Sequence, residues 1–228
     1  MGFDVKITTR ISILDLIAPH SCRGCGALGN IMCERCKKYN SKSILKMCAR
    51  CKKPISSCCC KTPVYSAFYR EGLMKDLVEE YKYHSIRAAA SALAELLNLA
   101  IPEDFPSESD SYDVSIIPLP TIPKHIRERG FDHMLLIAKE LSLIRKWKVE
   151  QALVRNKNTV QVGADEKTRK LQAASAYQIS EKWLLHPQST YLLLDDVWTT
   201  GASMEAAISV LKKAGATNIA SAVILTPR

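Results

Sequence analysis

The chain has 228 residues, of which 47% are hydrophobic and 24% are charged. This composition excludes wholesale disorder and is typical of a globular protein. The sequence contains no run of about 18 apolar residues, so no transmembrane helix is predicted. Charged residues interrupt the first apolar stretch at Asp4, Lys6, Arg10 and Asp15. We therefore expect no signal peptide and a cytoplasmic location, where cysteines stay reduced.

The net charge of +9 is confined to the N-terminal part of the chain. Residues 1–64 contain twelve basic and three acidic residues, whereas residues 65–228 contain twenty of each. Every cysteine lies between Cys22 and Cys60. This shift in composition predicts two parts, an N-terminal segment with a double zinc ribbon over residues 1–64 and a larger domain over residues 65–228.

The cysteines have the spacing of zinc ligands. Two Cys-x-x-Cys motifs can place four thiolates around one zinc ion, because each motif reverses the chain sharply. The first zinc site is expected to use Cys22, Cys25, Cys33 and Cys36. The second is expected to use Cys48 and Cys51 with two of Cys58, Cys59 and Cys60, and Cys58 with Cys60 is our choice among the three pairs. Disulfides or buried free thiols are the alternatives, and a reducing cytosol disfavours disulfides.

Zinc binding would also change the charge of this segment. A four-thiolate zinc site has a formal charge of −2, so two sites would leave the segment at about +5. Tyr39 is the only aromatic residue between Cys22 and Pro63, which makes base stacking weak and favours contacts with phosphates. Single-stranded DNA is therefore one candidate partner, and a solvated basic surface or an acidic protein partner is the alternative.

After the cysteines, periodic hydrophobicity predicts the secondary structure. Tyr65–Ala100 has helical spacing, whereas the proline- and serine-rich residues 102–112 predict a loop. The apolar run Val114–Leu119 predicts a buried strand. Phe131–Trp147 predicts a helix, and the polar stretch Val154–Ala173 predicts a long loop.

The C-terminal third predicts a strand, a helix and a strand. The first strand, Tyr191–Leu194, is expected to stop at the two aspartates that follow. The helix covers Ser203–Ala214, with Ser203 as its N-cap and Gly215 at its end. The last strand is Ile219–Leu225. Short apolar strands that alternate with helices indicate an α/β fold with a parallel sheet.

The pattern that follows the Tyr191–Leu194 strand predicts a phosphate site. Two carboxylates, Asp195 and Asp196, are followed by a turn that leads into the helix, Thr199-Thr200-Gly201-Ala202-Ser203. The amides and hydroxyls of such a turn, together with the helix dipole, suit a phosphate monoester. The carboxylates can accept hydrogen bonds from two vicinal hydroxyls and can hold Mg²⁺ through water. A ribose 5-phosphate satisfies all of these features.

A second segment predicts a site for a diphosphate. Pro118-Leu119-Pro120 follows the predicted Val114–Leu119 strand, and basic residues follow that turn at Lys124, Arg127 and Arg129. Arginine and lysine beside a helix N-terminus suit a diphosphate. A solvated basic turn is the alternative. His133, at the start of the next helix, is expected to be a surface or capping residue.

The pattern from Leu192 to Ser203 resembles the phosphoribosyl diphosphate signature of the type I phosphoribosyltransferases, with Ser203 in place of the usual threonine. The resemblance implies a phosphoribosyltransferase-like parallel sheet. It also implies binding of phosphoribosyl diphosphate with Mg²⁺ through Asp195, Asp196 and the Thr199–Ser203 turn, together with basic residues of the pyrophosphate loop.

Further motifs resemble the ComF family, in which a double zinc ribbon precedes a domain of this kind. They are Leu14–Pro19, Glu71–Leu73, Lys82-Tyr83, the IPLP and RERGF segments, and Arg155 with Gln161, Arg169 and Tyr177. Within this resemblance, Arg169 is a further residue expected to bind phosphoribosyl diphosphate. The chain departs from the family pattern at Asp132, His133 and Gln172.

The ComF resemblance implies an accessory role in natural transformation. The chain would then bind phosphoribosyl diphosphate or a related sugar phosphate, with single-stranded DNA and proteins of the DNA-uptake machinery as further partners. Two other functions stay open at this point, an active phosphoribosyltransferase with an unidentified acceptor and a ligand-sensing regulator. The fold class does not choose among them.

Overall fold

Most strands of the central sheet run parallel to one another, as the sequence predicts. The structure is a computed structural model that describes residues 20–40, 45–83, 87–106, 113–156 and 176–227. In sheet order the six strands are β3 (Leu45–Cys48), β4 (Pro63–Tyr69), β10 (Asn218–Thr226), β9 (Thr190–Val197), β5 (Val114–Pro118) and β6 (Lys148–Val149). The pairings within this described sheet are parallel except for the edge strand β3, which is antiparallel to β4.

The central strand β9 separates two hydrophobic cores. Its side chains alternate between the two faces of the sheet, as the pleat of a strand requires. Leu192 and Leu194 belong to one core, whereas Tyr191 and Leu193 belong to the other. Both faces of β9 are therefore buried, which explains why its sequence is a continuous apolar run.

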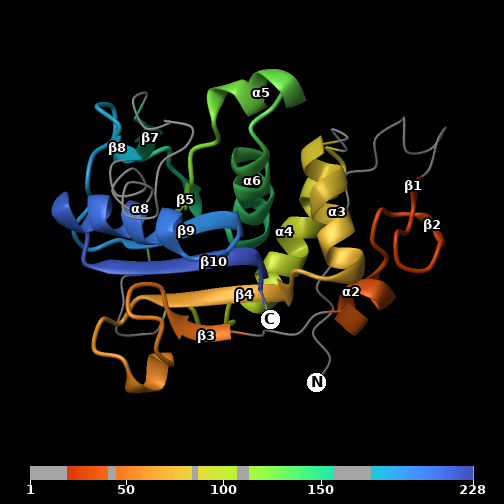
Figure 1. Ribbon diagram of the computed structural model, residues 1–228, viewed down its shortest axis with the longest axis horizontal. Helices are drawn as coiled ribbons and strands as arrows, with labels where there is room; N and C mark the ends of the chain where they lie inside the picture. The colour runs from red at the N-terminus through yellow and green to blue at the C-terminus, as the bar shows by residue number, and fades with distance from the viewer. Residues whose placement is uncertain (1–19, 41–44, 84–86, 107–112, 157–175, 228) are drawn as a thin grey trace.

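Helices cover both faces. The first core contains residues of α3 (Gly72–Tyr83), α4 (Ala89–Ala100) and α6 (His133–Arg145). The second core contains residues of α8 (Ala202–Lys213) and of a small antiparallel hairpin, β7 (Leu153–Arg155) and β8 (Tyr177–Ile179). Figure 1 shows α3 and α6 above the strands β10 and β4. No helix in the described ranges is long and apolar enough to cross a bilayer.

Several predicted elements are present with small shifts at their ends. Val114–Leu119 corresponds to β5 and Ile219–Leu225 to β10, while the predicted helices 131–147 and 203–214 correspond to α6 and α8. The strand predicted to stop at Leu194 continues to Val197 as β9. It continues because β10 pairs with it as far as Val197, whereas pairing with β5 ends at Leu194, and these backbone hydrogen bonds do not depend on side-chain polarity.

One prediction of secondary structure is wrong, one helix is not predicted, and one predicted loop begins within a strand. The start of the region predicted to be helical is the strand β4, whose five central residues are buried. The segment after Ile122, for which the sequence predicts no helix, is a short helix, α5 (Pro123–Arg129), which begins with a proline at its first turn and ends before Gly130, whose φ is 76°. Val154 and Arg155, at the start of the predicted long loop, belong to β7, which pairs with β8 beyond the end of that loop, and residues 157–175 between the two strands lie outside the described residues.

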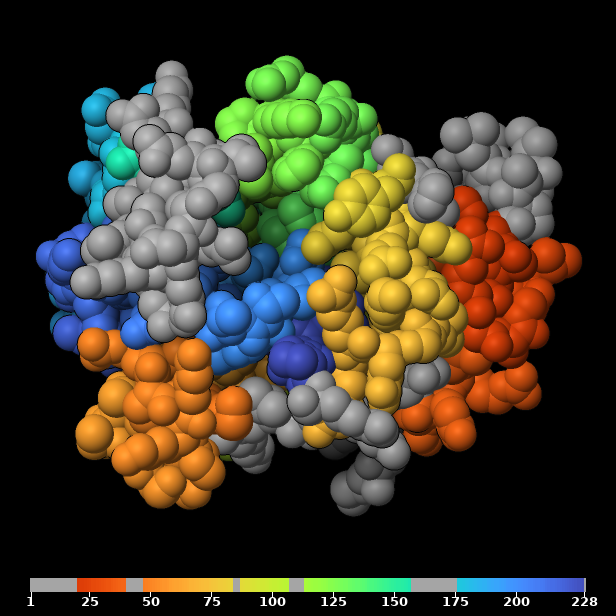
Figure 2. All heavy atoms as spheres, in the orientation of Figure 1, coloured from red at the N-terminus to blue at the C-terminus, as the bar shows by residue number. Residues whose placement is uncertain are grey.

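The two cysteine segments occupy different places around the sheet. The first contains the short pair β1 (His20–Ser21) and β2 (Leu28–Gly29), followed by α2 (Glu34–Asn40). The second lies beyond the end of β3 and includes a single 3₁₀ turn, η1 (Ile55–Ser57). Figures 1 and 2 show the first segment, in red, beside α3, and the second, in orange, at the opposite lower side.

The first cysteine segment packs directly against the helices of the larger part. Ile31 and Met32 are buried in the first core. Lys37 of α2 is buried and pairs with Glu34 and with the buried Glu95 of α4. The predicted boundary after residue 64 falls inside β4, so residues before it also contribute β3 and the start of β4 to the sheet.

Candidate functional site

The first cysteine cluster consists of Cys22, Cys25, Cys33 and Cys36, whose sulfur atoms all lie within 4.8 Å of one another. The Sγ atoms of Cys25 and Cys33 are 3.6 Å apart, and the Cys33 amide donates to the Cys22 sulfur at 3.3 Å. A side chain at Gly24 would approach the Cys36 sulfur to 2.8 Å. The glycine between the first two cysteines therefore leaves room for the fourth ligand.

The second cluster consists of Cys48, Cys51, Cys58 and Cys60, with sulfur atoms again within 4.8 Å. It contains Cys58 and Cys60, the pair chosen from the sequence. The Sγ atoms of Cys51 and Cys58 are 3.2 Å apart, and the Cys60 amide donates to the Cys58 sulfur at 3.2 Å. Cys59 is exposed to solvent outside the cluster.

Both clusters fit a zinc ion. Four thiolates around zinc at about 2.3 Å each would lie roughly 3.8 Å apart, close to the spacing of the sulfurs in both clusters. Burial opposes ionisation of Cys22 and Cys48, but backbone amides that donate to their sulfurs prevail and lower the pKa of each thiol to about 6. Thiolate is the form that binds metal, so each cluster already favours one ligand in that form.

The second candidate site lies at the C-terminal end of β9. Because the strand continues through the aspartates, its alternation places their carboxylates on opposite faces of the sheet. Asp195 follows Leu193 toward α8, and Asp196 follows Leu194 toward α3 and α6. The two carboxylates, predicted to act together on one ribose, therefore have different neighbours.

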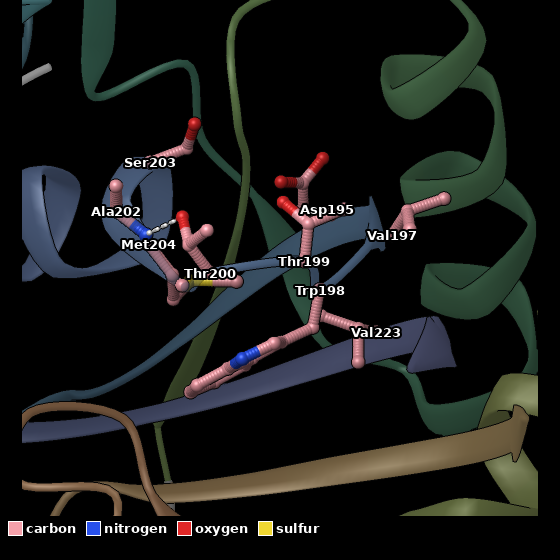
Figure 3. Close-up of a pocket in the computed structure, with 10 residues that line it drawn as sticks. Asp195, Val197, Trp198, Thr199, Thr200, Ala202, Ser203, Met204 and Val223 are labelled. Atoms are coloured by element: carbon pink, nitrogen blue, oxygen red, sulfur yellow. Dashed lines mark hydrogen bonds between the residues drawn. The ribbon is translucent and has the colours of Figure 1, made fainter. Parts of the chain in front are cut away.

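A hollow of about 280 Å³ opens beside Asp195, lined by the turn between β9 and α8. Figure 3 shows Asp195, Thr199 and Thr200 around it, with the Trp198 ring beside Val223. Gly201 has φ 78°, and a side chain there would approach the Trp198 ring to 2.8 Å. Trp198 is buried, so the ring cannot move away easily and the turn requires glycine.

The turn presents donors at the start of a helix. Gly201 is the N-cap of α8 and provides no side-chain cap, so the prediction that Ser203 caps the helix is wrong. The Ala202 amide donates to the Thr200 hydroxyl at 3.4 Å (Figure 3). Thr199, Thr200 and Ser203 are exposed. Amides and hydroxyls at the positive end of a helix dipole are suited to an anion.

Asp196 has two polar partners on the opposite face. Its Oδ2 atom lies 2.6 Å from Lys82 Nζ and 2.6 Å from His133 Nε2. The Arg129 guanidinium approaches His133 Nδ1 at 3.1 Å. Because arginine only donates, Nδ1 accepts and Nε2 carries the proton that His133 donates to Asp196.

The expectation that His133 is a surface or capping residue is wrong. Only 6% of it is exposed, because α6 places it over the end of β9. The helix is instead capped by Asp132, whose carboxylate accepts from the amides of Met134 and Leu135. No local pattern in the sequence indicates the contacts of His133 and Lys82 with Asp196, since three distant segments meet there.

The two aspartates titrate in opposite directions. Burial and the charge of Asp196 raise the pKa of Asp195 to about 7. Burial also acts to raise the pKa of Asp196, but the hydrogen bond from His133 and the charge of Lys82 outweigh it and lower the pKa to about 2. Adjacent carboxylates with separated pKa values are typical of functional sites, although structural ion pairs separate them too.

Arg155 joins the loop after β5 to the β7–β8 hairpin. Its guanidinium donates to the Pro120 carbonyl at 3.1 Å and to the Tyr177 hydroxyl at 3.5 Å. Its charge also acts on Asp195. Burial raises the pKa of Tyr177, so this hydroxyl keeps its proton. Arg155 and Tyr177, known from the sequence only through the family resemblance, thus lie on the Asp195 side of the sheet.

The basic residues predicted for the diphosphate site lie in two different environments. Arg129 contacts His133 and also lies 5.6 Å from the centre of the Tyr83 ring. Lys124 and Arg127 lie exposed on α5, where Lys124 pairs with Glu128 at 3.7 Å. Three other parts of the family resemblance, Leu14–Pro19, Gln161 and Arg169, lie outside the described residues.

Comparison of the chain with protein-family models and with curated proteins found no match.

Each cysteine cluster is expected to hold one zinc ion, giving two per chain. Cys60→Ser removes a predicted ligand and should leave about one zinc per chain, since a structural site needs all four ligands. Cys59→Ser is the matched control, because this neighbouring thiol is exposed outside the cluster, and it should keep both ions. Zinc analysis of the reduced, freshly purified proteins measures the zinc content of both variants. Loss of zinc in the control alone would contradict the ligand assignment.

The raised pKa of Asp195 predicts a cost to stability as the pH rises. The unfolded chain loses this proton near pH 4, whereas the folded protein retains it to about pH 7. Asp195→Asn removes the cost and should still accept the Asp196 amide, which donates to Asp195 Oδ1 at 2.9 Å.

We expect equal stability of the variant and the wild type near pH 4, and a more stable variant by about 2–4 kcal/mol near pH 8. Urea unfolding at the two pH values tests this. Asp113→Asn, at a half-exposed surface carboxylate, controls for the general effect of charge. A wild type that gains stability over Asp195→Asn with rising pH would contradict the prediction.

Proposed function

We propose that this protein binds phosphoribosyl diphosphate or a related sugar phosphate at the end of β9. One observation carries the proposal: a half-buried carboxylate and a hollow lined by a glycine-containing turn meet at the N-terminus of α8. In parallel α/β sheets, ligands bind at the C-terminal ends of the strands. The sheet and its crossover helices are compatible with a type I phosphoribosyltransferase-like fold, which we propose for residues 65–228.

In this proposal the Thr199–Ser203 turn binds the 5-phosphate. Its amides and the hydroxyls of Thr199, Thr200 and Ser203 donate to the phosphate oxygens, and the α8 dipole favours the charge. Asp195 accepts a hydrogen bond from a ribose hydroxyl. Asp196 does so through its second oxygen, because Oδ2 is shared by Lys82 and His133. Mg²⁺, when bound with the ligand, would neutralise charge on the diphosphate.

Arginines close to the carboxylates would bind the diphosphate. Arg155 holds the Pro120 carbonyl, and Arg129 lies beside His133. Both guanidinium groups can pair with phosphate oxygens. Lys124 and Arg127, on the exposed side of α5, and Arg169 would complete the set proposed from the sequence.

We propose in addition that the chain is a ComF-type accessory protein for natural transformation. The paired zinc-ligand clusters before an α/β sheet support this proposal, together with the sequence motifs that resemble the family. Proteins of the DNA-uptake machinery would be its partners in a cytoplasmic setting. Release of pyrophosphate on incubation with phosphoribosyl diphosphate, Mg²⁺ and each nucleobase would instead assign the chain to the active transferases.

Gly201→Ala is expected to abolish binding of phosphoribosyl diphosphate with Mg²⁺. The new side chain would displace Trp198 from below the turn, which moves the amides that bind phosphate. Gly26→Ala is the matched control, since Gly26 has nearly the same φ of 75° and no atom within 4 Å of an added side chain. Calorimetry should show loss of binding for Gly201→Ala and retention for Gly26→Ala.

The carboxylates provide a second variant of the same experiment. Asp195→Ala combined with Asp196→Ala should weaken phosphoribosyl diphosphate by roughly a hundredfold while inorganic phosphate still binds, because two hydrogen bonds to charged groups are lost only with the sugar. Equal affinity of the wild type and this double variant for phosphoribosyl diphosphate would rule out the site.

Single-stranded DNA is the second ligand we propose, and the charge around the second cysteine cluster favours it. Arg50, Lys52, Lys53 and Lys61 are all exposed there. The first segment exposes Arg35 and Lys38, but its Lys37 is buried in ion pairs and its Arg23 pairs with Glu80. Contacts of the residues around the second cluster with phosphates would release counterions and depend little on base sequence.

Replacing Lys52, Lys53 and Lys61 by alanine should weaken binding of single-stranded DNA and flatten its salt dependence. The slope of log affinity against log salt concentration is negative, and each lost phosphate contact makes it less negative by about 0.7. The matched control replaces Lys139, Lys182 and Lys213, which are exposed elsewhere on the protein. Equal slopes for the two triple variants in a fluorescence-anisotropy titration would favour an acidic protein partner instead.

A further inference from the structure

A second hollow of about 280 Å³ lies on the face of the sheet that α3 covers. We name it the α3 pocket. Its cationic lining residues are Arg70, Lys75 and Lys82, and its apolar lining includes Val78, Val197 and Leu225. Val197 also lines the hollow beside Asp195, so the two hollows meet the same end of β9 and are close neighbours.

The cations of the α3 pocket come from different elements and keep capacity to bind an anion. Arg70 follows β4, and its amide donates to the Thr226 carbonyl at 2.7 Å, which holds its backbone against β10. Arg70 and Lys75 approach the Glu79 carboxylate only to 4.0 Å and 3.9 Å. Glu79 therefore forms ion pairs with both cations, but the separations are too long for hydrogen bonds, so the N–H donors can still turn toward an anion.

Lys82 connects the α3 pocket to the carboxylates. It is the most buried cation of the pocket, with 16% of its side chain exposed, and it pairs with Asp196 at 2.6 Å. The ammonium group has three donors, so it can retain Asp196 and also bind an anion in the pocket. The apolar lining beside it strengthens such an ion pair by excluding water.

The order of the strands decides which part of a ligand this pocket can meet. The loop after β5, where we propose that the diphosphate binds, lies on one side of β9, and the ends of β10 and β4 lie on the other. The α3 pocket adjoins β10 through Leu225 and β4 through Arg70. A group bound in it therefore reaches the ribose carboxylates from the side opposite the diphosphate.

We propose that the α3 pocket binds a phosphate monoester carried by a second molecule, the one that meets the ribose held by Asp195 and Asp196. The assignment of this second molecule as the partner of the bound ribose rests on the proposed function. Binding of phosphate in the pocket does not. Three cations outnumber the two carboxylates of Glu79 and Asp196, and this excess of positive charge favours an anion over a neutral ligand.

The test counts phosphate ions bound per chain, using inorganic phosphate as the probe. Full-length, zinc-loaded protein is dialysed to equilibrium against labelled phosphate at constant ionic strength. The wild type should hold two phosphates, one in each hollow. Arg70→Ala combined with Lys75→Ala should weaken one of them by roughly tenfold or more, since two charge-assisted contacts are lost, and leave the other unchanged.

Two further variants separate this proposal from the proposed function. Gly201→Ala should lose the phosphate of the first hollow and keep that of the α3 pocket. Lys148→Ala, at an exposed lysine that pairs with Asp113 near the start of β5, is the matched control and should hold two. The side chains of Arg70, Lys75 and Lys148 are about half exposed or more, so circular dichroism should confirm an unchanged fold.

If the variant with both Arg70→Ala and Lys75→Ala still binds two phosphates with the affinity of the wild type, the proposal of a phosphate site in the α3 pocket is overturned. A single phosphate on the wild type that Gly201→Ala removes would overturn it as well. Retention of both phosphates by Gly201→Ala would count against the proposed function alone, and the Arg70 and Lys75 result would still decide the α3 pocket.

Discussion

The carboxylate of Asp196 holds together the C-terminal edge of the sheet. Lys82 of α3 and His133 of α6 both meet its Oδ2 atom, so one oxygen of β9 links two helices. All three groups are largely buried. A buried ion pair adds little net stability, but loss of one partner leaves an unpaired charge and is strongly destabilising. The geometry of the three elements is therefore mutually dependent, and Asp196 is the point at which they meet.

This arrangement gives the two neighbouring aspartates different roles. Asp195 faces the hollow at the start of α8, the Asp196 amide donates to its carboxylate at 2.9 Å, and burial raises its pKa. Asp196 faces α3 and α6 and is held ionised by a cation and an imidazole N–H. The two hollows lie at the same edge of the sheet, where Asp195 lines the first and Lys82, the partner of Asp196, lines the second. Our two ligand proposals follow this division.

The cysteine clusters attach to this framework at two separate points. The first is anchored by Lys37, which reaches Glu95 of α4, and by Arg23, which pairs with Glu80 of α3 at 2.7 Å. The second begins at Cys48, the last residue of the edge strand β3. Metal binding can contribute on the order of 10 kcal/mol to folding at each such site. Because both clusters are joined to elements of the central fold, bound metal would stabilise the sheet and its helices as well as the cysteine segments.

The sequence by itself determined what depends on short spacing. The Cys-x-x-Cys motifs predict the four-cysteine clusters, the apolar runs predict β5, β9 and β10, and the pattern after β9 predicts a turn that leads into a helix. Tertiary structure decided what depends on distant partners. Pairing with β10 makes a strand of residues 63–69 and extends β9 through the aspartates, which sends their carboxylates to opposite faces. Packing of α3 and α6 brings Lys82 and His133 to Asp196, and no local pattern encodes such a meeting, because it exists only after the sheet has brought the segments together.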